Sequence, residues 1–181
     1  ATVTVPAGTN PRAIAVNPVT NRIYVANNGS DNVTVIDGSN HSTVTIAAGT
    51  NPYAIAVNPV TNKTYVANNG SANVTVIDGA DNSTNTVPAG FNPHAIDVNP
   101  ATNKIYVANN SMDVFTLIDG ASNAAENQAG NLVNPVAVAV NPVTNRIYIA
   151  NGSAAKATII DGDTNLPTQV VVGTGSAAIA V

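Results

Sequence analysis

The chain contains no cysteine, no tryptophan and a single methionine among its 181 residues. The absence of cysteine excludes disulfide bonds, thiol nucleophiles and thiolate metal sites. Charged side chains make up 9% of the residues, whereas a typical globular domain has about 25%. With six basic and ten acidic side chains, the chain lacks the basic surface that is typical of nucleic-acid-binding proteins. No apolar run approaches the roughly 20 residues of a membrane-spanning helix. We therefore expect neither a nucleic-acid partner nor a membrane span.

Asparagine, valine and threonine are abundant instead, with 28, 26 and 20 copies. Valine and threonine favour pleated strands, and asparagine favours turns. The residues that form long helices, such as leucine, glutamate and lysine, are scarce, and Glu126 is the only glutamate. The composition therefore predicts an all-β fold with many short strands.

An internal repeat organises the whole chain. The segment Ala-Ile-Ala-Val-Asn-Pro at 13–18 returns with small changes at 54–59, 95–100 and 137–142, and 178–181 begins a fifth copy. Residues 13–53 and 54–94 are identical at 30 of 41 positions. Such closeness indicates recent duplication, or design, of one unit. We therefore treat 1–181 as a single array with repeats 13–53, 54–94, 95–136 and 137–177, preceded by an outer strand and connection at 1–12.

Each repeat reads as four short strands. In the first repeat we expect strands at 13–16, 22–26, 33–36 and 43–46, separated by turns rich in Asn, Pro and Gly. A period near 41 residues with four strands is typical of a β-propeller blade, a four-stranded antiparallel sheet. A β-helix is the second interpretation, although its coils are usually shorter. The first strand is apolar on both faces, which predicts that neighbouring blades cover each blade on both sides.

The residues around the second strand resemble a known repeat. The segments at 24–27, 65–68 and 106–109 read Tyr-Val-Ala-Asn and resemble the Tyr-Val-Thr-Asn signature of YVTN-family β-propeller repeats. The flanking Asn-Pro-x-Thr-Asn and Val-Ile-Asp-Gly segments match as well, while the last copy reads Tyr-Ile-Ala-Asn at 148–151. The resemblance covers essentially the whole chain. It implies an extracytoplasmic protein (secreted, periplasmic or of a surface layer) that serves as a scaffold and has no single reaction.

The number of blades is small for such a propeller. Residues 2–5 and 168–172 look like outer strands, and 178–181 looks like a fifth inner strand, so the chain holds about four blades and a fraction. A lone open array would expose apolar sheet faces and strand edges. We therefore expect part of a six- to eight-bladed ring, or an array that closes by self-association, and not a compact monomer.

Residues that recur in every repeat are most simply structural. We expect the aspartates of the Asp-Gly pairs to accept hydrogen bonds from turn amides. The cations of the second strand are expected to be solvated on the outer surface. The repeat tyrosines are expected to pack with hydrogen-bonded hydroxyls. The three sets are Asp37, Asp78, Asp119 and Asp161; Arg22, Lys63, Lys104 and Arg146; and Tyr24, Tyr65, Tyr106 and Tyr148.

Residues that differ between the copies are better candidates for binding. The position before each inner strand reads Arg12, Tyr53, His94, Val136 and Ala177, while its neighbours barely change. The turns between the second and third strands lie at the same end of a propeller and also vary. Variable side chains at one end of a rigid scaffold are a common binding surface for a protein, a small molecule or a glycan. The candidates there are Arg12, Tyr53, Phe91, His94, Asp31, Asp113 and Lys156.

Asp97 is a further candidate, because it replaces the alanine found at 15, 56 and 139. A carboxylate near the propeller axis is costly unless it is hydrated or paired. We expect Asp97 to line the central channel or to pair with His94, and in the second case the pKa of His94 would lie above that of a free imidazole.

Catalytic and metal-binding patterns are weak. His41 and His94 are the only histidines, and residues 161–165 resemble the opening of a calcium loop without its later Gly and Glu. No nucleophile elbow or phosphate-binding loop occurs. We therefore predict no catalytic residue, metal or cofactor, and favour a non-enzymatic extracytoplasmic scaffold or binding module. The alternative is an enzyme, or part of one, of the lactonase-like or lyase-like propeller type, with its chemistry at the channel mouth around His94 and Asp97.

Overall fold

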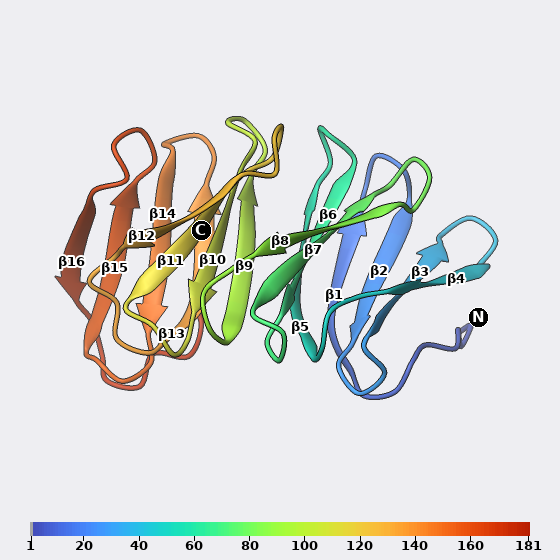
Figure 1. Ribbon diagram of the computed structural model, residues 1–181, viewed down its shortest axis with the longest axis horizontal. Coiled ribbons are helices and arrows are strands. Elements are labelled where there is room, and N and C mark those ends of the chain that lie inside the picture. The colour runs from blue at the N-terminus through green and yellow to red at the C-terminus, as the bar shows by residue number, and fades with distance from the viewer. Residues whose placement is uncertain (1) are drawn as a thin grey trace.

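The computed structural model describes residues 2–181 as four separate four-stranded antiparallel sheets, each ordered as its strands follow one another in the chain (Figure 1). We refer to each sheet as a blade. The first blade contains β1 (Pro11–Asn17), β2 (Arg22–Asn27), β3 (Asn32–Asp37) and β4 (Thr43–Ala47). The second contains β5 (Pro52–Asn58), β6 (Lys63–Asn68), β7 (Asn73–Asp78) and β8 (Thr84–Pro88). The third contains β9 (Pro93–Asn99), β10 (Lys104–Asn109), β11 (Val114–Asp119) and β12 (Ala125–Ala129). The fourth contains β13 (Pro135–Asn141), β14 (Arg146–Asn151), β15 (Lys156–Asp161) and β16 (Pro167–Val171).

The blades follow one another along an open arc. Figure 1 shows the first blade in blue at one end and the fourth in orange and red at the other. The first strands of successive blades, β1, β5, β9 and β13, contact one another and form the inner side of the arc. The fourth blade does not meet the first, so the ring is not closed. None of the residues from 2 to 181 lies in a helix, so the structure holds no helix able to cross a membrane.

The predicted all-β architecture of four-stranded blades is confirmed, and the predicted strands differ by a few residues at their ends. Two predicted strands are absent. Residues 2–5 form no strand, because no third strand precedes them in the described chain to pair with them. Residues 178–181 form no strand for the same reason, since no second strand follows. A strand needs a hydrogen-bonded partner as well as a suitable sequence.

The hydrophobic core lies between blades. Each blade presents a face of branched aliphatic side chains to the blade before it, and a face of alanine, tyrosine and valine to the blade after it. Between the first two blades, Tyr24, Ala26 and Val35 pack against Val66 and Ile77. The predicted packing of the repeat tyrosines is confirmed for Tyr24, Tyr65 and Tyr106, which are fully buried. The predicted hydrogen bonds are wrong, because their hydroxyl oxygens have no partner among the described residues.

Asparagine is abundant because the turns require it. Asn21, before β2, adopts a left-handed backbone with φ of 53°, and Asn62, Asn103 and Asn145 do the same in the other blades. Asparagine tolerates this conformation better than most residues. A second left-handed position precedes each inner strand, and a third lies in each turn between the third and fourth strands, where His41 takes the place of Asn82, Asn123 and Asn165. His41 is thus a turn residue.

The recurring charges also hold the turns and the blades. The side-chain oxygens of Asp37, Asp78, Asp119 and Asp161 accept hydrogen bonds from backbone amides two or three residues later, as predicted. The prediction that the second-strand cations are merely solvated is wrong. Arg22 donates to the carbonyl oxygen of Gly79 at 2.6 Å, and Lys63 donates to that of Gly120 at 2.9 Å. Lys104 donates to Gly162 at 3.2 Å, so these three cations link their blades to the next one. Arg146, in the last blade, lies 3.6 Å from Asp161 of its own blade.

Candidate functional site

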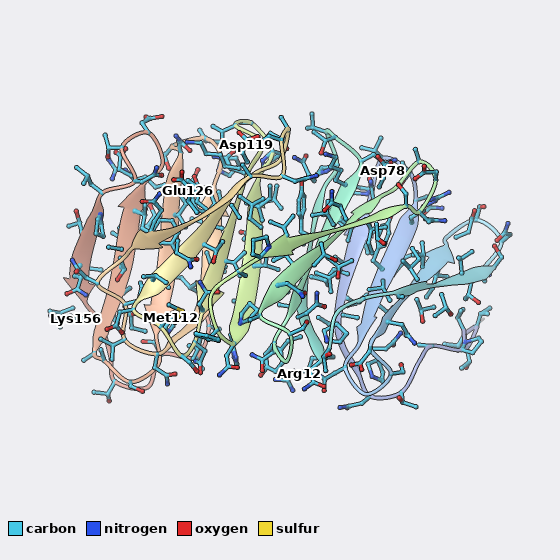
Figure 2. The ribbon with its side chains drawn as sticks, viewed as in Figure 1. Arg12, Asp78, Met112, Asp119, Glu126 and Lys156 are labelled. Carbon is cyan, nitrogen blue, oxygen red and sulfur yellow. The ribbon has the colours of Figure 1, made fainter. Side chains whose placement is uncertain are left out.

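A β-bulge places the variable residue at the start of each inner strand. In the first blade, Pro11 pairs with Asn27 and Ala13 pairs with Ala26, so Arg12 has no partner in the ladder. The same irregularity occurs at Tyr53, His94 and Val136. A bulge leaves one residue unpaired and redirects its side chain. The four variable residues are therefore set out of the regular pleat along one side of the arc, the lower side in Figure 2, where Arg12, Met112 and Lys156 are labelled.

Three of these bulge residues form a continuous stack across three blades. The guanidinium of Arg12 lies over the ring of Tyr53, 4.1 Å from its centroid, and also donates a hydrogen bond to the Tyr53 hydroxyl. The ring centroids of Tyr53 and His94 lie 4.3 Å apart, with the planes tilted by 40°. Arg12 is exposed, whereas Tyr53 and His94 are half-buried. The structure thus brings these three candidate side chains into contact, and we call this set the Arg–Tyr–His stack.

Side-chain amides from the preceding blades hold the stack in place. Asn28 donates to the carbonyl oxygen of Pro52 at 3.3 Å, and Asn69 donates to that of Pro93 at the same distance. Pro52 and Pro93 come directly before Tyr53 and His94. The turn after β2 or β6 thus fixes the start of the next blade's inner strand, and with it the position of the variable side chain.

The position of His94 in the stack lowers the pKa of its imidazole. Burial lowers the pKa of His94 below its ordinary value of 6.5, and the positive charge of Arg12 lowers it further. The expected rise in the pKa of His94 is therefore wrong. The lowered pKa favours the uncharged imidazole, and Arg12 supplies the positive charge of the stack.

Asp97 does not pair with His94. One carboxylate oxygen accepts a hydrogen bond from the backbone amide of Val98, and the other accepts one from Val140 of β13, each at 2.8 Å. Burial raises the pKa of Asp97 above its ordinary value, and these two hydrogen bonds offset only part of that rise. The imidazole of His94, in the bulge, instead lies against the ring of Tyr53 in the preceding blade. Asp97 therefore links the inner strands of the third and fourth blades.

The other candidates lie on the same side of the arc. Phe91 and Asp113 are exposed, whereas the side chains of Asp31 and Lys156 make hydrogen bonds within the protein. Phe91 is 64% exposed, and its backbone amide contacts the sulfur of Met112 at 3.3 Å. Asp31 is structural, since its carboxylate accepts a hydrogen bond from the Asn51 amide at 2.8 Å. Asp113 is exposed, and its carbonyl oxygen accepts a long bond from Gly130 at 3.4 Å. Lys156 donates to Gln169 on β16 of the same blade, away from the stack.

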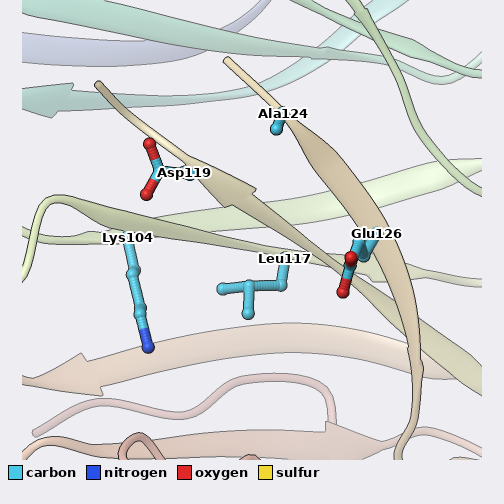
Figure 3. Close-up of a pocket in the computed structure, with 5 residues that line it drawn as sticks. All are labelled: Lys104, Leu117, Asp119, Ala124 and Glu126. Atoms are coloured by element: carbon cyan, nitrogen blue, oxygen red, sulfur yellow. The ribbon is translucent and has the colours of Figure 1, made fainter. Parts of the chain in front are cut away.

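A cavity of about 180 Å³ lies at the opposite end of the third blade, lined by Lys104, Leu117, Asp119, Ala124 and Glu126 (Figure 3). Its three charged groups already have structural partners. Lys104 bonds Gly162, Asp119 caps its own turn, and Glu126 accepts a hydrogen bond from Gln128 at 3.0 Å. Within residues 2–181, no group of three His, Cys, Asp or Glu side chains is placed to hold a metal ion.

The sequence identified Arg12, Tyr53 and His94 as candidates, but revealed neither their contact with one another nor what surrounds them. The bulges and the linking cations were not predicted, although the constant proline before each variable residue is a signal for the first. Proline lacks an amide hydrogen and is found in sheets mainly at strand starts, edges and bulges.

No protein-family model matches the sequence, and no curated protein matches it. Solved structures do match in fold. Hydrazine synthase of Kuenenia stuttgartiensis has a TM-score of 0.83 and 20% identity, over 95% of this chain and 52% of that one. The WD40 repeats of RRP9 have a TM-score of 0.80 and 10% identity, over 93% of this chain and 52% of that one. The dihydro-heme d1 dehydrogenase NirN has a TM-score of 0.73 and 19% identity, over 91% of this chain and 37% of that one.

The chain thus spans about half the length of the first of these structures. Identities of 10–20% show the fold and not the function. The blades and these similarities together establish an all-β chain of four β-propeller blades in an open arc.

Proposed function

We propose that this chain is a non-enzymatic, extracytoplasmic binding module that recognises a carboxylate-bearing glycan at the Arg–Tyr–His stack. The observation that carries the proposal is the stack itself, in which the variable side chains of three consecutive blades lie in contact. The extracytoplasmic location is supported by the resemblance to YVTN-type repeats.

The chemistry of the stack suits such a ligand. The guanidinium of Arg12 keeps exposed N–H groups, and arginine pairs with carboxylates through two parallel hydrogen bonds. The ring of Tyr53 is occupied by Arg12 and His94, whereas the exposed ring of Phe91 offers an apolar face for a sugar ring. The neutral imidazole of His94 adds a hydrogen-bonding group. A protein loop with an acidic side chain would meet the same guanidinium but would not need the ring faces.

The enzyme alternative depended on the pair of His94 and Asp97. The two carboxylate oxygens of Asp97 are bound by the amides of Val98 and Val140, so they are not directed at His94. Since propellers of similar fold include enzymes as well as WD40 repeat proteins, the fold does not choose between these classes.

The test uses glucuronate as the probe and glucose as the uncharged control. Glucuronate is expected to shift the imidazole resonances of His94 and the ring resonances of Tyr53 in an NMR titration, and glucose is expected to shift neither. Arg12→Ala should abolish the glucuronate effect, whereas Lys156→Ala, a cation on the same side of the arc but outside the stack, should leave it unchanged. Equal shifts with glucose, or an unchanged response in Arg12→Ala, would overturn the proposal.

A further inference from the structure

The two ends of the arc present sheet faces that no blade covers in the described chain. On the first blade, Ile14 and Val16 are 66% and 54% exposed, whereas the equivalent Ile96 and Val98 of the third blade are 8% and 6% exposed. On the fourth blade, Tyr148 is only half-buried, although its three equivalents are fully buried. We call these surfaces the open aliphatic face (Ile14, Val16, Ile23 and Ile36) and the open tyrosine face (Ala137, Tyr148 and Ile159). Their neighbours Val25, Ala139 and Ala150 are already buried.

The molecule itself shows what covers such faces. Between the third and fourth blades, Val138, Val140 and Ile147 of the aliphatic face pack against Tyr106 and Ala108 of the tyrosine face. The same kinds of side chain meet between the first and second blades and between the second and third. The two open faces carry the two halves of this interface on one chain, so they are complementary to each other.

The hydrogen bonds between neighbouring blades also support pairing of the two open faces. Asn17, Asn58 and Asn99 donate side-chain hydrogen bonds to Asn62, Asn103 and Asn145 of the following blade at 2.8–2.9 Å. The equivalent donors of the fourth blade are Asn141 and Arg146. Among residues 2–181, the side chain of Arg146 has one polar contact, with Asp161 of its own blade at 3.6 Å. The acceptors equivalent to Asn62 and Gly79 in the first blade are Asn21 and Gly38.

We propose that a second copy of this chain covers both faces. The open tyrosine face of each copy packs on the open aliphatic face of the other, so that two arcs of four blades close a ring of eight with two-fold symmetry. Arg146 then donates to Gly38 of the second copy, and Asn141 donates to Asn21. A hollow of about 230 Å³ between Arg12, Ile14 and Val25 on the open aliphatic face is filled at the same time.

The segment after β16 competes with the second copy. Residues 178–181 repeat the sequence of residues 13–16 at the start of the open aliphatic face. They form no strand, and of the residues from 172 onward all but Ser176 and Ile179 are exposed. The second copy's β1 therefore takes the place that this tail can occupy only loosely.

Sedimentation velocity over a range of concentrations tests the proposal. The expected mass is twice the chain mass of 18.2 kDa. A mass of one chain at every concentration would overturn the proposal. That result is expected if further blades of a longer polypeptide cover the two open faces. A series of ever larger species would overturn the closed ring.

Matched variants test the faces themselves. Ile14→Asp should abolish the dimer, whereas Val60→Asp, at a similarly exposed valine in a turn, should not. Tyr148→Asp should abolish the dimer equally. If the dimer survives Tyr148→Asp but is lost in Ile14→Asp, two aliphatic faces pair with each other and the proposal is wrong. Circular dichroism confirms that each variant is folded. Deleting residues 173–181 should tighten the dimer several-fold, and its loss on deletion would also contradict this arrangement.

Discussion

At the scale of single residues, the molecule departs from its own repeat mainly where blades start. Arg12, Tyr53 and His94 occupy equivalent bulges, so three unlike side chains are brought into one stack by three like backbones. A repeat unit that keeps its backbone and changes one side chain can build a mixed site without any loop insertion.

The first residue-scale prediction concerns Arg12. Because the guanidinium charge lowers the pKa of His94, Arg12→Ala should raise that pKa toward its ordinary value of 6.5. Because the imidazole remains partly buried, the pKa of His94 should stay below that ordinary value even without Arg12. The His94 pKa is measured by NMR titration of the imidazole carbon-bound protons. Lys156→Ala is the control that should leave the His94 pKa unchanged, and an unchanged pKa in Arg12→Ala would show that the two side chains do not interact.

The second prediction concerns the buried hydroxyl of Tyr65. Burial raises the pKa of Tyr65 to about 12, and the charge of Asp119 adds to this rise. Since an unfolded tyrosine titrates near 10, the stability that this group contributes is fully present below pH 10 and is lost as the pH rises toward 12. Tyr65→Phe should therefore resist alkaline unfolding better than the parent chain.

At pH 7 the same variant should be unchanged, or more stable by about 1 kcal/mol, because it removes a buried polar atom without a hydrogen-bond partner in the described chain. Urea unfolding at pH 7 and pH 11 measures both effects. A clear loss of stability at pH 7 would mean that the hydroxyl makes a stabilising hydrogen bond.

At the scale of strands and turns, sequence reasoning was most successful where one physical requirement decides the outcome. The alternation of Val, Thr and Ile with Asn-rich turns located the four strands of each blade, because side-chain pattern and turn chemistry agree there. Residues 2–5 and 178–181 have good strand sequences and yet form none, because strand formation also depends on a partner that sequence pattern does not reveal.

The candidate site shows the same limit. Variation at one repeat position was enough to locate Arg12, Tyr53 and His94. The pairing of His94 with Asp97 was wrong because the orientation of a side chain at a bulge depends on backbone pairing that the sequence does not show.

The element-scale prediction concerns the turn glycine Gly79. A Cβ atom added there would lie 2.7 Å from the carbonyl oxygen of Asn62 and still closer to its side chain, which is held by the left-handed turn. Gly79→Ala should therefore lower the free energy of unfolding by about 1–3 kcal/mol, as overpacking usually does. Gly173→Ala is the matched control, since nothing lies within 4 Å of an added Cβ there. Chemical denaturation compares the two, and equal effects would contradict a steric role for Gly79.

At the scale of the whole molecule, the hydrophobic core lies between blades and not within them. The three hydrophobic clusters each span two blades, and the cations of the second strands cross the same boundaries. In such an array each unit depends on its neighbours, so the two terminal blades are the least supported.

The whole-molecule prediction compares one substitution at two equivalent positions. Ile105 is fully buried between blades, whereas Ile23 lies half-exposed on the open aliphatic face. Ile105→Ala should cost about 2–5 kcal/mol of unfolding free energy, the usual range for a buried aliphatic residue. Ile23→Ala should cost clearly less, provided that unfolding is measured at a dilution where the mass is that of one chain. Equal costs would mean that the position in the repeat, and not the neighbouring blade, sets the contribution.

The side-chain amides that hold the stack are also sites at which the protein can deamidate as it ages. Asn28 and Asn69 are each followed by glycine, the neighbour that least hinders attack of the backbone nitrogen on the side-chain amide. Deamidation would turn each donor to Pro52 or Pro93 into a carboxylate that repels the carbonyl oxygen it now binds. The exchange of the amide nitrogen for a carboxylate oxygen, with water consumed and ammonia released, would free the start of an inner strand at either site. Ageing would therefore loosen Tyr53 and His94 before it affects the core, so the proposed glycan recognition would be lost while the blades remain folded.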